Sequence, residues 1–281
     1  MRSELTVRAL KLMGVFAHPD DESLGAGGTL AKYASEGVEV AIVTATRGDA
    51  GRFHGHRLDD PVHPGPVELA RIREAELREA ASALGVRDVS CLDYRDQALD
   101  RANPRQAVAD IAWHVRRQRP DVVITFGPDG SYGHPDHVAI SQFTTAAMVA
   151  AADSGVAVTG EGGPGLPHVV SKLYYMAWPA STWAAYELAI QKLVSSVDGV
   201  ERQATPWPDW AITTVIDTRK SWPTVWRAVS CHQSQVAAYE GLKTLSPEHH
   251  EAVWGSQSFY RAFSHVNGGR VRETDLFEGI R

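Results

Sequence analysis

The stretch Leu12-Met13-Gly14-Val15-Phe16-Ala17-His18-Pro19-Asp20-Asp21-Glu22 decides the fold of this chain. Its first five residues form an apolar run typical of a buried parallel strand, and a histidine and three acids follow directly. Acids beside a buried strand are costly unless something compensates their charge, and a bound cation is the usual compensation. The stretch therefore predicts a strand that ends at a metal site.

A second cluster of the same kind lies more than a hundred residues downstream, at Tyr132-Gly133-His134-Pro135-Asp136-His137. It follows the apolar segment 121–126, which we interpret as another buried strand. Together the two clusters offer enough imidazoles and carboxylates for a metal site with a catalytic base beside it. A hydrolytic metal centre needs about three protein ligands and one open position for water. We interpret the pair as the site of a metal-dependent hydrolase.

Strand-like and helix-like segments alternate through the first half of the chain. We expect strands over 10–16, 38–44, 89–92 and 121–126, and helices over 28–35, 67–84, 107–117 and 134–151. This alternation predicts an α/β fold with a mostly parallel sheet flanked by helices. If the strand order is 3-2-1-4, the ligand site lies at the carboxyl ends of strands one and four. The two clusters follow those two strands, so the topology would bring them together.

The second half predicts a smaller mixed α/β part. We expect strands over 173–176, 212–217 and 258–263, and helices over 183–194 and 222–233. No repeat or linker divides the chain, so we expect a single domain over 1–281, with a catalytic core over 8–152 and a substrate-shaping part over 168–281. Substrate specificity is expected in three irregular stretches, 51–66, 153–167 and 205–210.

The composition is that of an ordinary globular protein, with 43% hydrophobic and 22% charged residues. A formal net charge of −6 argues against nucleic acid as a partner. Cys91 and Cys231 are the only cysteines, too few for a disulfide framework or a thiolate zinc cluster. The chain shows no membrane-spanning run and no apolar leader. We expect a cytoplasmic protein with no membrane span, and a homo-oligomer is possible.

The two clusters resemble the paired motifs of the PIG-L/LmbE-like zinc N-deacetylases. In this chain the motifs read Ala17-His18-Pro19-Asp20-Asp21-Glu22 and Gly133-His134-Pro135-Asp136-His137, and further similar stretches lie at 46–51, 73–77, 94–96 and 232–235. The resemblance implies a Rossmann-like fold. It also implies removal of an N-acetyl group from an N-acetylglucosamine-type substrate, such as a glucosaminyl-inositol, a glycolipid or a related sugar.

Carried over position by position, the resemblance implies His18, Asp21 and His137 as ligands of Zn²⁺, although Fe²⁺ or another divalent ion suits the same set. Asp20 would be the general base that acts on the attacking water, and His134 the electrophile or general acid. The other implied site residues are Asp136 beside an imidazole, Tyr132 at the tetrahedral intermediate, and Arg73 and Asp96 at sugar hydroxyls. Asp49 is a further candidate substrate contact, or a turn residue between glycines.

The local sequence around the second cluster agrees with these roles. Pro135 suits the first position of a helix, which makes His134 the cap residue and His137 a first-turn residue. The positive end of a helix disfavours protonation of His137 and keeps its imidazole available to a metal. The same field disfavours a charged His134, so a general-acid role needs Asp136 or a second carboxylate to offset it.

Other functions stay open at this point. The chain could be an amidase acting on a larger thiol S-conjugate, a sugar-binding protein whose metal is purely structural, or a metal-dependent phosphoesterase. A structural zinc site would have four protein ligands, and three strong candidates favour an open catalytic site. Leu30 stands where a dinucleotide loop needs its third glycine, so we expect no nucleotide cofactor.

Several aromatic and histidine residues have two interpretations each. Trp207 and Trp210 either wall a sugar pocket or pack in the core. His232 either reaches the site from the carboxyl-terminal half or lies on a helix surface. His54, His56 and His63 form either a second metal site or part of a solvated loop, and we favour the loop.

Overall fold

The computed structural model describes all residues except 1–7, 159, 161, 189–193, 198 and 270. Its centre is a seven-stranded sheet in the order β3-β2-β1-β4-β5-β9-β8. The strands are β1 (Lys11–Phe16), β2 (Glu39–Thr46), β3 (Asp88–Tyr94), β4 (Val122–Phe126), β5 (Lys172–Met176), β8 (Thr214–Asp217) and β9 (Ser256–Ser264). The five strands from β3 to β5 are parallel, and β9 and β8 add to the edge as antiparallel strands.

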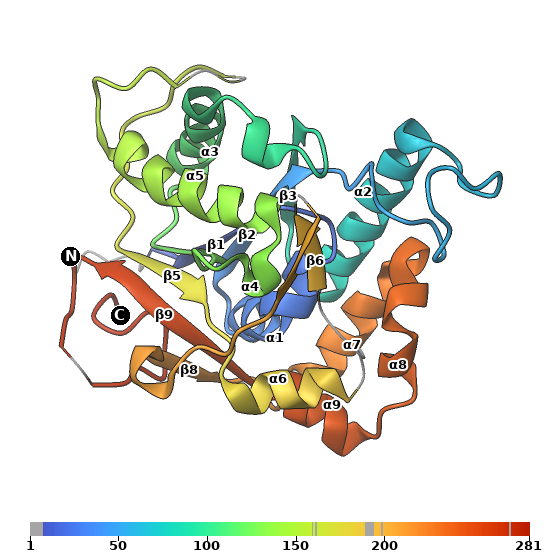
Figure 1. The fold of residues 1–281 in the computed structure, drawn as a ribbon. Coiled ribbons are helices and arrows are strands. Elements are labelled where there is room, and N and C mark those ends of the chain that lie inside the picture. The colour runs from blue at the N-terminus through green and yellow to red at the C-terminus, as the bar shows by residue number, and fades with distance from the viewer. Residues whose placement is uncertain (1–7, 159, 161, 189–193, 198, 270) are drawn as a thin grey trace, which may run out of the picture.

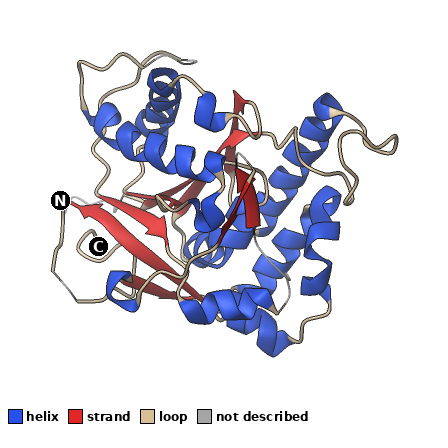
Figure 2. Ribbon diagram, in the orientation of Figure 1, coloured by secondary structure: helices blue, strands red, loops and turns tan. Residues whose placement is uncertain are grey.

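Helices cover both faces of the sheet (Figures 1 and 2). α3 (Pro104–Gln118) and α5 (Pro135–Ala152) contact each other on one face, while α1 (Asp21–Ser35) and α2 (Pro66–Ala83) share a contact with α7 (Trp222–Cys231) on the other. The remaining helices are α4 (Gly130–Gly133), α6 (Ala180–Glu187), α8 (Glu240–Lys243) and α9 (Pro247–Trp254), with 3₁₀ turns at Leu99–Arg101, Asp209–Ala211 and Gln233–Tyr239. β6 (Val194–Val197) and β7 (Val200–Gln203) form a separate hairpin.

The predicted α/β fold and the strand order 3-2-1-4 are confirmed. The three central strands β1, β2 and β4 are buried almost throughout, because helices lie on both of their faces. The first reversal of strand order lies between β1 and β4. The segments that follow these two strands therefore meet at one edge of the sheet, and they are the segments that carry the two histidine-acid clusters.

The first helix is longer than the sequence predicted. It begins at Asp21, seven residues before the expected start, and runs through Gly25 and Gly28. A Cβ atom at Gly25 would lie 2.8 Å from Met176 Sδ, and one at Gly28 would lie 2.9 Å from Thr218 Cβ. The helix packs so closely against its neighbours at these positions that only glycine fits there. The low helix propensity of glycine is therefore a poor guide to where this helix begins.

The carboxyl-terminal half also departs from expectation. The helix predicted over 183–194 ends at Glu187, and Val194 opens the β6–β7 hairpin, which the sequence did not predict; residues 189–193 lie outside the described part of the chain. β8 and β9 extend the same sheet, and Ile216, Phe259 and Phe277 belong to the main hydrophobic core. This shared core supports the single domain over 1–281, which stays a prediction. No helix in the described residues is long and apolar enough to cross a membrane.

Candidate metal centre and active site

Three predicted ligands converge at the carboxyl edge of the sheet. His18 follows β1, Asp21 opens α1, and His137 lies in the first turn of α5; all three are buried. His18 Nδ1 lies 3.2 Å from His137 Nε2 and 3.5 Å from Asp21 Oδ2, and His137 Nε2 lies 3.3 Å from Asp21 Oδ1. Two imidazole nitrogens and a carboxylate so close together are a ligand set that suits a divalent transition metal.

The outer atoms of His137 and Asp21 are already engaged by backbone groups. His137 Nδ1 donates to the carbonyl oxygen of Gly130 at 3.2 Å, which leaves Nε2 as the free lone pair. Asp21 Oδ2 accepts the backbone N–H groups of Ala17 and His18, at 3.2 and 2.8 Å. Such contacts orient metal ligands and fix the tautomer of a ligand imidazole.

His18 is oriented by two carboxylates. Its Nε2 lies 3.1 Å from Asp96 Oδ1 and 3.2 Å from Asp136 Oδ2. Burial disfavours the charged ring, but Asp96, Asp136 and Asp21 outweigh this effect and raise the pKa of His18 well above its ordinary value. Three buried acids around one imidazole leave the site rich in negative charge, which a divalent cation would neutralise.

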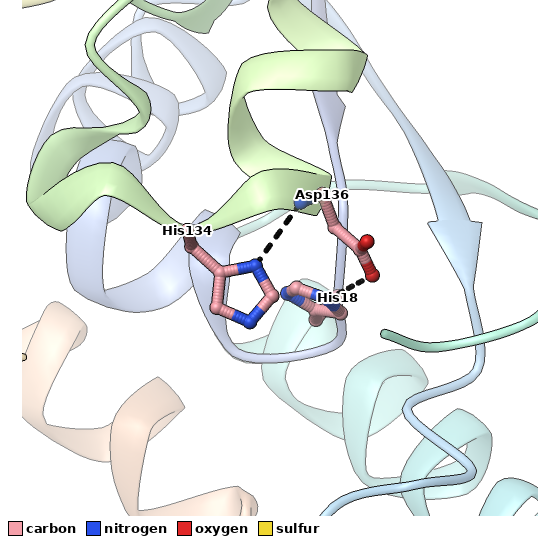
Figure 3. Close-up of side chains that lie close together, drawn as sticks. All are labelled: His18, His134 and Asp136. Atoms are coloured by element: carbon pink, nitrogen blue, oxygen red, sulfur yellow. Dashed lines mark hydrogen bonds and ion pairs between the residues drawn. The ribbon is translucent and has the colours of Figure 1, made fainter. Parts of the chain in front are cut away.

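A second group of potential ligands is formed by His18, His134 and Asp136 (Figure 3). His134 Nδ1 accepts the backbone N–H of Asp136 at 3.2 Å, so this nitrogen is the cap of α5. The Asp136 carboxylate accepts the backbone N–H groups of Gln97 and Leu99, at 2.7 and 3.0 Å. Both oxygens of Asp136 already accept backbone N–H groups, whereas Asp21 keeps Oδ1 beside His137 Nε2. The group of His18, Asp21 and His137 is therefore the better candidate metal site.

His134 is held as a neutral imidazole that can donate from one nitrogen. Burial lowers its pKa to about 3, and the neighbouring His18 and His137 act in the same direction. Because Nδ1 accepts a hydrogen bond, the proton of the neutral ring is on Nε2. Asp136 raises the pKa of His134, as the sequence predicted, but its effect is too small to keep the ring charged. Burial also raises the pKa of Tyr132, with Asp21 acting in the same direction, so its hydroxyl stays protonated.

Asp20 has a strained backbone and a side chain held by arginine. Its φ of 108° is in the left-handed region, which few residues with a side chain adopt. Asp20 Oδ2 lies 3.2 Å from Arg73 Nη2. The same guanidinium donates to the carbonyl oxygens of Pro19 at 2.6 Å and Gly48 at 3.0 Å. Arg73 thus binds the loop that carries Asp20 as well as lining the cavity where it was predicted to bind sugar.

The cavity at this site has a volume of about 340 Å³. Its polar lining residues include His18, Asp20, Asp21, Arg73, Asp96, Gln97, Ser131, Tyr132, His134, His137 and Gln235. Its apolar and aromatic lining residues include Leu24, Phe126, Trp178, Trp183 and Tyr186. The described lining includes neither Trp207, which packs 5.6 Å from the ring of Tyr260, nor Trp210, which is 84% exposed. Those two tryptophans do not wall the pocket.

The sequence contained a signal for one of the aromatic lining residues, Trp178, which we did not use. Trp178 follows β5, the strand next to β4, so the strand-end rule that placed the two clusters also places this tryptophan. Trp183 is in α6, 5.6 Å from the Trp178 ring. Tyr186 donates its hydroxyl to the carbonyl oxygen of Leu24 at 2.7 Å, so its ring and not its hydroxyl is available to the cavity.

Other predicted residues have structural partners. Asp49 Oδ1 accepts the backbone N–H of Asp96 at 3.0 Å, and Asp49 is not in the described lining of the cavity. Its contact with substrate stays a prediction. His232 is fully buried beside the first motif, so it does not lie on a helix surface. His56 pairs with Asp60 at 2.9 Å, and no metal-ligand group involving the 51–66 loop occurs among the described residues.

Comparison with known proteins shows which family the chain belongs to. The family model described as PIG-L, GlcNAc-PI de-N-acetylase, matches residues 13–148. A protein of Kineococcus radiotolerans named 1D-myo-inositol 2-acetamido-2-deoxy-alpha-D-glucopyranoside deacetylase is 36% identical, over 96% of this chain and 83% of its own. This chain belongs to the PIG-L family. A Rhodococcus jostii protein with the same name is 34% identical, over 96% of this chain and 98% of its own. The predicted PIG-L/LmbE-like family and an amide-hydrolysing enzyme are thereby confirmed.

Solved structures show the same fold at lower identity. N,N'-diacetylchitobiose deacetylase of Pyrococcus horikoshii matches with a TM-score of 0.65 and 22% identity, over 90% of this chain and 84% of its own. The 4-carboxy-2-hydroxymuconate hydratase GalB of Pseudomonas putida matches with a TM-score of 0.66 and 19% identity, over 92% and 99%. Since a hydratase has this fold as well, the fold alone does not fix the reaction of a PIG-L protein.

Proposed function

We propose that this PIG-L protein is a zinc-dependent deacetylase that removes the N-acetyl group from an N-acetylglucosaminyl-inositol or a related N-acetylated sugar. The observation that carries the proposal is the meeting of His18, Asp21 and His137 at a cavity that Asp20 and His134 also line. The relatives named above are deacetylases of such an inositol glycoside. Two nitrogen ligands and one oxygen ligand suit Zn²⁺, and Fe²⁺ fits the same set.

The residues around the metal site divide the work of amide hydrolysis. A bound metal would supply a Lewis acid that activates water and polarises the acetyl carbonyl. Asp20 accepts the proton of the attacking water as general base. His134 donates from Nε2 to the developing oxyanion, and the Tyr132 hydroxyl is a second donor. Because His134 is neutral, Asp20 is left to deliver the proton to the leaving amine.

The cavity lining combines hydrogen-bonding and aromatic side chains, as a sugar site needs. Asp96, Gln97 and Gln235 can bond to hydroxyl groups, and Trp178 and Trp183 present ring surface to the apolar face of a pyranose. The cavity volume of about 340 Å³ is at the small end of ligand sites. The predicted substrate contacts of Arg73, Asp96 and Asp49 belong to this proposal, with Asp96 also orienting His18.

Acetate release and metal content test the roles of the first motif separately. We expect Asp20→Asn to lower kcat by about 100-fold or more and to keep one metal per chain. Asp21→Asn and His137→Ala should lose the metal and the activity together. Asp217→Asn, at the exposed end of edge strand β8 and outside the described cavity lining, is the matched control and should do neither. Full turnover by Asp20→Asn, or a retained metal without His137, would contradict the proposal.

A substrate screen separates the alternatives. The zinc-loaded protein is offered N-acetylated sugars, inositol glycosides, glycolipid head groups and thiol S-conjugates. Acetate release from an inositol glycoside is expected. Release of a larger acyl fragment from an S-conjugate would favour the amidase function. Sugar binding without any turnover would favour the binding protein.

A further inference from the structure

The strained backbone of Asp20 is held by a buried hydrogen-bond chain. The Asp20 N–H donates to Glu22 Oε2 at 2.9 Å. The other carboxylate oxygen, Oε1, accepts the Ser23 hydroxyl at 2.6 Å and lies 2.8 Å from His232 Nε2. Glu22 and His232 are both fully buried. A carboxylate oxygen only accepts hydrogen bonds, so Nε2 of His232 carries the proton.

His232 is placed by several contacts that anchor its segment to the site. It follows α7, and the next residues bond to elements of the first half. Ser234 donates its backbone N–H and its hydroxyl to Glu76 of α2, at 2.7 and 2.6 Å. Gln235 donates to the carbonyl oxygen of Arg52 at 2.7 Å and lines the cavity. The position of His232 is therefore fixed from both sides.

These hydrogen bonds matter because neither the backbone conformation of Asp20 nor the buried carboxylate of Glu22 is stable without partners. A residue with a side chain stays in the left-handed region only where its surroundings hold it there. A buried carboxylate needs donors on both oxygens. If the His232 donor is lost, the Glu22 carboxylate has one hydrogen-bond partner fewer and is free to shift, and the Asp20 N–H shifts with it.

We propose that His232 is a positioning residue for the general base. Its Nε2 fixes Glu22, and Glu22 fixes the Asp20 backbone in the conformation that brings the Asp20 carboxylate to the cavity. The inference rests on the proposed function, since it takes Asp20 as the base. Neither His232 nor Glu22 belongs to the described lining of the cavity, so their effect on turnover is indirect.

A pair of substitutions at one position tests this directly. Glutamine places its side-chain amide nitrogen near the position of Nε2, whereas asparagine is one methylene shorter and does not reach Glu22. We expect His232→Asn to lower kcat about 10- to 100-fold, with KM and metal content close to wild type. His232→Gln should recover most of the lost kcat. Both variants are polar and similar in size, so a general folding defect would affect them alike.

His250 is the matched control, because it is also buried in the carboxyl-terminal half and its Nε2 lies 2.8 Å from a backbone oxygen, that of Leu242. His250→Asn should lower the melting temperature and leave kcat unchanged. The proposal is overturned if His232→Asn keeps wild-type kcat, if His232→Gln is as slow as His232→Asn, or if His250→Asn slows turnover equally. Full activity of Asp20→Asn would instead remove the proposed base itself.

Discussion

Replacing Glu273 by glutamine should lower the free energy of unfolding by about 3 to 5 kcal/mol, the usual loss when one partner of a buried ion pair is removed. Glu273 is 1% exposed and lies where β5, β8 and β9 meet. The groups that bind its carboxylate are Lys172 Nζ, Asn267 Nδ2, the Tyr174 hydroxyl and the Thr214 hydroxyl, each at 2.7 Å, and Arg261 Nη1 at 2.8 Å. The substitution leaves two cations there without their counter-charge.

The pKa of Glu273 gives a second measure of the same loss. Burial raises the pKa, but the donors, Lys172 first, outweigh burial and lower it from 4.5 to about 2. That difference corresponds to about 3 kcal/mol. Because the folded-state pKa is the lower one, this stabilisation is fully present above the unfolded pKa of 4.5 and is lost as the pH falls towards 2. Wild type and variant should therefore become more alike below pH 4.5.

Urea unfolding, followed by tryptophan fluorescence and circular dichroism, measures the effect. The difference between wild type and Glu273→Gln should be about 3 kcal/mol or more at pH 7 and at least about 1 kcal/mol smaller at pH 3.5. Glu79→Gln, an exposed acid in the interior of α2, is the control and should change stability by less than about 0.5 kcal/mol. A loss below about 1 kcal/mol at pH 7, or one independent of pH, would refute the reasoning.

Three further outcomes are expected. Asp136→Asn should weaken metal affinity about 10- to 100-fold in calorimetric titration, because it removes a carboxylate that orients His18. An unchanged affinity would mean that Asp96 alone orients His18. Trp183→Ala should raise KM for an N-acetylated sugar about 2- to 10-fold with little change in kcat, and an unchanged KM would argue against stacking. Asn103 caps α3, because its Oδ1 accepts the Arg105 N–H at 3.0 Å. Asn103→Ala should lower the free energy of unfolding in urea by about 1 kcal/mol.

Much of the fold was predictable because its signals are local. The apolar run 12–16 and the strand-like segment 121–126 identify two buried strands, and the alternation of strands and helices limits their order. The sequence failed where tertiary contacts override propensity. Gly25 and Gly28 look like helix breakers, yet α1 runs through them, and glycine is needed there because Met176 and Thr218 leave no room for a side chain.

By itself, the sequence determined that two histidine-acid motifs would meet at one edge of a parallel sheet, because each directly follows a strand and strand order brings the strand ends together. The tertiary structure alone decided the partners of these residues. It placed Asp96 and Asp136 on one nitrogen of His18, Arg73 on the loop around Asp20, and His232 on Glu22 from 210 positions away. Such pairings depend on how helices and loops pack in three dimensions, and no local pattern or spacing encodes that packing.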